Sequence, residues 1–124
     1  MPISHEQFLE MVRRVEGCSV RSPVPADAVE EELPLHCEIM KWCKDNRAAY
    51  IHARPDKKSG INPGAPDFTI LHHGKLFLVE CKTRTGKRSI DQLAWAILAE
   101  MNGFIVRECR SFSEFLSIIG TTKQ

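Results

Sequence analysis

The sequence predicts one α/β domain in which a mixed β-sheet is flanked by helices, and three observations predict it. Two apolar runs, FTIL and KLFLVECK, flank a His-Gly pair at residues 73 and 74, which is typical of an antiparallel hairpin. A strand, an amphipathic helix and another strand then follow over residues 75–109, and such a unit forms a right-handed parallel βαβ crossover. The chain has 124 residues, about the size of a single domain.

The N-terminal part is expected to form a helical arm. Ser4 and Gln7 have the form of a capping box, and apolar residues recur at helical spacing until Gly17. A Pro-rich, acidic stretch follows, which is typical of a linker. We therefore predict an N-terminal helical arm and linker over residues 1–33 and the main domain over residues 34–124.

The elements of the main domain follow from helical or alternating apolar spacing and from capping residues. Pro34 suits the first turn of a helix, and Ser89 with Gln92 has the form of a second capping box. The expected order is a helix from Pro34 to Asp45, a strand at residues 49–54, the two hairpin strands, a helix from Ser89 to Asn102, a strand over FIVREC and a helix from Ser111 to Gly120.

Composition excludes several classes of protein. Hydrophobic residues at 43% and charged residues at 27% are typical of a folded globular chain. No apolar run approaches the roughly 18 residues that a membrane-spanning helix needs. The five cysteines include no CxxC pair, which argues against a disulfide scaffold or a zinc finger. We expect a protein of the reducing cytoplasm with no membrane contact and no organic cofactor.

The charge is distributed unevenly. Residues 1–40 carry eight acidic and three basic side chains, whereas residues 41–88 carry eleven basic and four acidic ones. A basic segment of this kind attracts polyanions such as nucleic acid, although solvated basic faces are also common.

The hairpin predicts a convergence of charged side chains. With a two-residue turn, paired positions have numbers that add to 147, so Asp67 faces Glu80. Lys82 lies two residues beyond Glu80 and projects from the same face, while Cys81 points away. Two opposed carboxylates repel each other unless a positive charge lies between them, and carboxylate oxygens suit Mg²⁺. Glu80 and Lys82 could otherwise be ordinary charges of an edge strand.

These residues also resemble a known family. Pro66-Asp67 followed by Glu80-Cys81-Lys82 is similar to the PD-(D/E)XK nuclease signature. The wider match of GAPDF, LFLVECK, a basic Gly-containing loop and SIDQ looks like the VRR-NUC branch, in particular its small stand-alone phage and bacterial members. The resemblance covers about residues 34–119 and implies a restriction-endonuclease-like core with elements in the order αβββαβ.

The resemblance implies a divalent-metal-dependent DNA endonuclease, selective for branched, flap or junction DNA, in a bacterial or phage-encoded protein. Asp67, Glu80 and the backbone carbonyl of Cys81 would bind Mg²⁺, with Mn²⁺ as a substitute, and Lys82 would orient or deprotonate the attacking water. Two alternatives remain: a catalytically silent nucleic-acid-binding module, and an accessory subunit whose arm recruits a partner.

Two further residues have competing roles. Glu38 would match the helix-borne acid of the family, or it could be a solvated residue on the flank of its helix. Gln92 would match the glutamine at the start of the following helix, but it is also the third residue of a capping box, and both roles need one side chain.

Basic side chains on the loops beside the hairpin are the candidate DNA phosphate contacts. They are Arg54, Lys57, Lys58, Arg84, Lys87 and Arg88.

We also expect a homodimer. The core is small for gripping duplex DNA, and two-fold pairing is the commonest form of assembly. The apolar face of the arm could pack on its own core or on a partner subunit.

Overall fold

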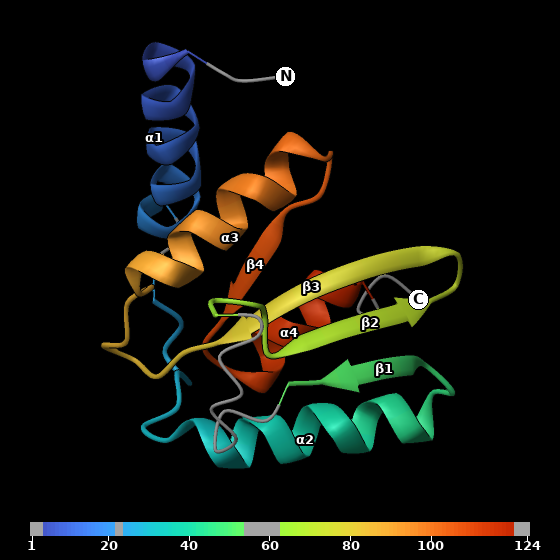
Figure 1. Ribbon diagram of the computed structural model, residues 1–124. Coiled ribbons are helices and arrows are strands. Elements are labelled where there is room, and N and C mark those ends of the chain that lie inside the picture. Colours follow the sequence, from blue (N-terminus) through green and yellow to red (C-terminus); the bar gives the residue numbers. More distant parts are fainter. Residues whose placement is uncertain (1–3, 22–23, 54–62, 121–124) are drawn as a thin grey trace.

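A four-stranded mixed sheet with the strand order β1-β2-β3-β4 forms the centre of the protein (Figure 1). The computed structural model describes residues 4–21, 24–53 and 63–120, and the structural statements below concern these residues. The elements are α1 (His5–Arg21), α2 (Glu32–Asp45), β1 (Ala49–His52), β2 (Phe68–His72), β3 (Lys75–Cys81), α3 (Ile90–Met101), β4 (Val106–Cys109) and α4 (Phe112–Ile119).

The predicted hairpin register is confirmed. β2 and β3 pair antiparallel, with His72 opposite Lys75 and Phe68 opposite Val79. His73 and Gly74 both have positive φ angles, 49° and 76°. Positive φ at both central residues is the mark of a type I′ turn, whose twist matches that of the strands. The two-residue turn therefore sets which residues face each other at the far end of the hairpin.

The parallel crossover is also confirmed. β3 pairs parallel to β4, with Leu78 opposite Val106 and Glu80 opposite Glu108. Helix α3 connects these two strands. Together with the hairpin this arrangement confirms an α/β domain with a mixed sheet.

The two faces of the sheet are covered by different helices. One face, including Phe68, Ile70 and Val79, packs on α2 and α4 through Leu35 and Phe115. The opposite face packs on α3, where Ala96, Ile97 and Ala99 meet Leu78 and Val106, with Met11 and Val12 of α1 beside them. Figure 1 shows α1 beside α3, at a distance from α2. The last residues of β3 therefore lie between two packed layers.

Side-chain caps begin three of the helices as the sequence predicts. Ser4 and Gln7 bond each other's backbone N–H groups at the start of α1. Ser89 and Gln92 do the same at α3, and the Ser111 hydroxyl accepts the N–H of Glu114 at α4. These bonds satisfy N–H groups that have no partner within the helix.

Some predicted boundaries are wrong. Helix α1 continues past Gly17 to Arg21, and α2 begins at Glu32, two residues before Pro34. Pro34 is tolerated there because N–H groups in a first turn lack an intrahelical acceptor in any case. The strand predicted at residues 49–54 ends at His52.

The segment before α2 is bound to the main domain. The N–H of Val29 donates to the carbonyl of Arg110, and the N–H of Arg84 donates to the carbonyl of Val29. The Arg84 side chain bonds Glu30 and the carbonyls of Ala26 and Ala28. The end of the predicted linker is thus held at the carboxyl ends of β3 and β4.

No described helix combines the length and the apolar character needed to cross a membrane.

Candidate metal and nuclease site

Asp67 lies at a bend immediately before β2, where it ties two strands together. Its backbone carbonyl accepts the N–H of Ala53, and its Oδ2 accepts the N–H of Cys81 at 2.7 Å. Because Asp67 precedes the strand, its side chain need not follow the alternation by which successive strand residues point to opposite faces of the sheet. The carboxylate therefore reaches the end of β3.

Gly64 places the loop that carries Asp67 against the start of α3. Its φ angle is +82°, and a Cβ atom there would lie 2.1 Å from the carbonyl oxygen of Asp91. Only glycine allows both this conformation and this close approach. The GAPDF segment is thereby held next to the helix that carries Gln92.

Glu80 is fully buried and is paired with Arg88. Its Oε2 accepts a 2.9 Å hydrogen bond from Nε of Arg88, whose guanidinium also donates to the carbonyl of Val106. Burial raises the pKa of the Glu80 carboxyl, while the charges of Arg88 and Lys82 act in the opposite direction. Arg88 also lies 3.9 Å from the carboxylate of Glu108, the neighbour of Glu80 on β4. The cation beside Glu80 is therefore a side chain of this chain.

Lys82 and Gln92 meet at the same end of the sheet. Lys82 is buried, and its Nζ donates a 2.6 Å hydrogen bond to Oε1 of Gln92. The same oxygen accepts the N–H of Ser89 at 2.9 Å. The two roles considered for Gln92 are thus compatible, because one amide oxygen has two lone pairs.

Asp67 belongs to a group of potential metal ligands that also includes His36 and Cys81. One ligand atom each from His36, Asp67 and Cys81 lie within 4.8 Å of one another, and this is the group of three or more such side chains found in the described parts of the chain. The expectation that Cys81 points away from Asp67 is therefore wrong, because the Asp67 carboxylate bends toward the end of β3.

Helix α2 contributes residues other than the predicted Glu38, which is exposed on that helix. His36 Nε2 lies 3.8 Å from Oδ2 of Asp67 and 3.9 Å from Oε1 of Glu32. Glu32 and His36 are one turn apart, so they share a helix face. Their i, i+4 spacing was the available sequence signal, which was missed because the start of α2 was predicted two residues too late.

The candidate phosphate contacts differ in their surroundings. Arg54, Lys57 and Lys58 lie outside the described residues. Lys87 is exposed, and Arg84 is engaged by Glu30. The side chain of Arg88 is only 8% exposed and is held by Glu80, so in this structure it is turned to the interior and not to the solvent from which DNA would approach.

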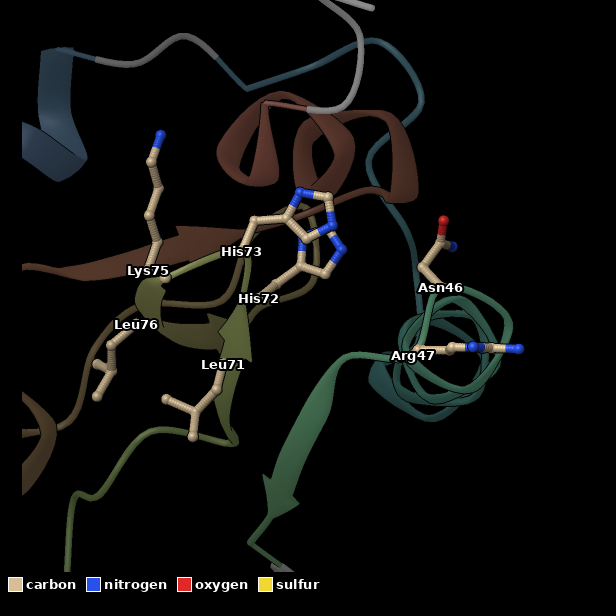
Figure 2. A pocket seen from close by; sticks show the side chains of 8 residues that line it. Asn46, Arg47, Leu71, His72, His73, Lys75 and Leu76 are labelled. Carbon is tan, nitrogen blue, oxygen red and sulfur yellow. The ribbon is translucent and has the colours of Figure 1, made fainter.

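A separate hollow lies at the hairpin turn, with a volume of about 560 Å³. Figure 2 shows the His72 and His73 rings, which stack at 3.9 Å, near Asn46 and Arg47 at the end of α2. None of its eight lining residues carries a carboxylate. This hollow is therefore chemically distinct from the Asp67 site.

Two buried atoms beside the site test whether a cation fits there. Within the described residues, Nε2 of His36 and Oε1 of Glu80 are buried side-chain atoms without a hydrogen-bond partner. An uncompensated buried polar atom is costly, and a cation would satisfy either one. Both His36 and Glu80 thus offer a buried atom that could bind a cation.

Comparison with known proteins returned no matching family model, no matching curated protein and no matching solved structure.

Proposed function

We propose that this protein is a divalent-metal-dependent endonuclease that hydrolyses phosphodiester bonds in DNA, selectively at branched, flap or junction structures. The observation that carries the proposal is the placement of Glu80 and Lys82 in the interior at the end of β3, across the hairpin from the half-buried Asp67. Charged side chains are rarely buried, and buried charged side chains are frequent at functional sites. The resemblance of PD and ECK to the PD-(D/E)XK signature, and the restriction-endonuclease-like core it implies, support the same conclusion.

The residues would divide the work by their chemistry. A bound divalent ion would activate water and offset the negative charge that develops on the phosphate. Asp67 and Glu80 would hold that ion, with the carbonyl of Cys81 completing the set. Lys82 adds a positive charge near the phosphate, and Gln92 positions Lys82 through the 2.6 Å hydrogen bond.

Arg88 would have to yield part of its hold on Glu80 when an ion binds. Oε1 of Glu80 is already without a partner, so this oxygen can meet an ion while Oε2 stays on Arg88. Arg88 would then be a positioning residue.

The test is incubation of the full chain with end-labelled linear, flap, splayed and four-way DNA in Mg²⁺, Mn²⁺ or EDTA. We expect cleavage in the metal-containing reactions alone, strongest on a branched substrate. Asp67→Asn should abolish it, and Lys41→Gln, an exposed change on α2, should leave it unchanged. Absence of cleavage of every substrate with both metals would contradict the proposal.

A catalytically silent nucleic-acid-binding module is the second candidate, and the Glu80–Arg88 pair favours it. A guanidinium bound to a carboxylate in the interior competes with a metal for that carboxylate. Retardation of the branched substrates in a gel without cleavage would support this candidate. An accessory subunit would show neither cleavage nor retardation.

A further inference from the structure

The side of Asp67 that faces α2 carries ligand chemistry unlike an all-oxygen site. His36 offers an imidazole nitrogen and Cys81 a sulfur within 4.8 Å of the Asp67 carboxylate. Mg²⁺ prefers oxygen ligands, whereas imidazole and thiolate favour Zn²⁺ and related transition ions.

The His36 ring is aimed at this position and lacks a partner there. The residue is 3% exposed, and its Nε2 is a buried atom without a hydrogen bond. The nearest carboxylate oxygens, on Asp67 and Glu32, are 3.8 and 3.9 Å away, beyond hydrogen-bond distance. A buried nitrogen without a partner, flanked by two carboxylates, has surroundings that suit a metal ligand.

The other nitrogen of His36 is already engaged. Nδ1 lies 2.8 Å from Nε2 of His52, whose ring stacks on Phe68 at 4.6 Å. When Nδ1 holds the proton and donates it to His52, Nε2 presents its lone pair toward Asp67. Histidines that bind metals are commonly oriented by a hydrogen bond of this kind on the second nitrogen.

We propose that Nε2 of His36, the Asp67 carboxylate and Sγ of Cys81 bind a Zn²⁺-class transition ion in preference to Mg²⁺, with Glu32 beside them as a further carboxylate. The Cys81 thiol releases its proton to solvent as the metal–sulfur bond forms. This inference deepens the proposed function, and any effect of the bound ion on cleavage rests on that function. Metal binding itself requires neither DNA nor catalysis.

The test measures Zn²⁺ and Mg²⁺ binding to the full chain without DNA, by competition with a fluorescent chelator. The Cys37→Ser background removes an exposed thiol that could bind Zn²⁺ elsewhere. We expect tighter binding of Zn²⁺ than of Mg²⁺. His36→Gln should weaken Zn²⁺ binding by more than about 10-fold and Mg²⁺ binding by much less. The matched control is His73→Gln, a change of an exposed turn residue, which should leave both affinities unchanged.

Two further measurements keep the test decisive if His36→Gln fails to fold. His52→Phe retains an aromatic ring over Phe68 but removes the acceptor for Nδ1, and it should weaken Zn²⁺ binding by about 10- to 100-fold. Co²⁺ bound in the Cys37→Ser background should show thiolate-to-metal charge-transfer absorption, which Cys81→Ser should remove. Unchanged Zn²⁺ affinity in a folded His36→Gln or His52→Phe protein would overturn the proposal, as would absence of the charge-transfer band.

The two proposals fail in different ways. Cleavage that persists in Mg²⁺ with His36→Gln, together with no Zn²⁺ binding by the parent protein, overturns the transition-ion site and leaves the nuclease standing. Zn²⁺ binding that depends on His36, without cleavage of any DNA, supports the site and overturns the nuclease.

Discussion

Nζ of Lys82 donates a hydrogen bond to the Oε1 atom of Gln92 that also accepts the N–H of Ser89. A single amide oxygen thus joins the start of α3 to the end of β3. The capping box that begins the helix therefore also determines where the Lys82 ammonium lies.

Gln92→Ala and Ser89→Ala should separate the cap from the positioning of Lys82. Ser89→Ala removes the acceptor for the N–H of Gln92 and should lower the free energy of unfolding by about 1 kcal/mol. Gln92→Ala also removes the anchor of Lys82, so its cleavage rate should fall about 10- to 100-fold below that of Ser89→Ala. Urea unfolding and single-turnover cleavage measure the two effects, and equal rates in both variants would remove Gln92 from the mechanism.

Arg88→Met should be strongly destabilising. It leaves the fully buried Glu80 carboxylate without its cation, which costs about 3–5 kcal/mol. Replacing both residues by Met removes the unpaired charge and should recover most of that loss. Lys87→Met is the matched control, because Lys87 is an exposed neighbour whose change should stay within about 0.5 kcal/mol. Urea unfolding at neutral pH compares the parent protein with these three variants. An Arg88→Met variant as stable as the Lys87→Met control would show that the pair contributes nothing to stability.

Gly64→Ala should destabilise the protein more than Gly74→Ala does. Both glycines have positive φ angles, but a Cβ at position 74 meets nothing within 4 Å, whereas one at position 64 meets the backbone of Asp91. Gly74→Ala should therefore lower the free energy of unfolding only by the cost of backbone strain, about 1 kcal/mol. Gly64→Ala should lower it by that cost and also by the loss of the packing of its loop on α3. Thermal unfolding compares them, and similar melting temperatures would contradict the close approach.

Charge reversal on the loops should weaken DNA binding. Lys87→Glu should lower the affinity for DNA, alone or combined with Lys57→Glu and Lys58→Glu at the two other lysines predicted to contact phosphates. The slope of the logarithm of the DNA-binding constant against the logarithm of the salt concentration should become shallower by about 0.9 for each lost phosphate contact. Lys41→Glu is the control, because Lys41 already pairs with Asp45 on α2. A salt slope that falls equally in the control would show a general charge effect rather than a contact.

Deletion of residues 1–20 tests the role of α1 in assembly. Met11 and Val12 pack against the α3 core, while Phe8 and Leu9 remain 43% exposed. We expect the full chain to form a homodimer that uses the exposed face of α1, and the shortened chain to be a monomer. Light scattering at micromolar concentration measures the molar mass of both proteins. A monomeric full chain would contradict the dimer, and a dimer of the shortened chain would place the interface on the main domain.

The local pattern of the sequence was sufficient wherever neighbouring residues determine the structure. The His-Gly turn set the hairpin register because positive φ at both residues selects a two-residue type I′ turn. Ser89 and Gln92 marked the start of α3 because a capping box is formed within four residues. Asp67, Glu80 and Lys82 could be assigned to adjoining strand ends for the same reason.

The partners of those side chains depended on the tertiary structure. Pairing Glu80 with Arg88 requires the loop after β3 to bring Arg88 back to the end of that strand. The approach of His36 to Asp67 requires α2 to pack across the start of β2. It also requires the helix to begin at Glu32, two residues before the predicted start at Pro34, so that Glu32 and His36 share one helix face. Hydrophobic spacing shows which face of a helix is buried, but the polar atoms that meet there are determined only when separate elements pack, because burial makes each of them find a partner.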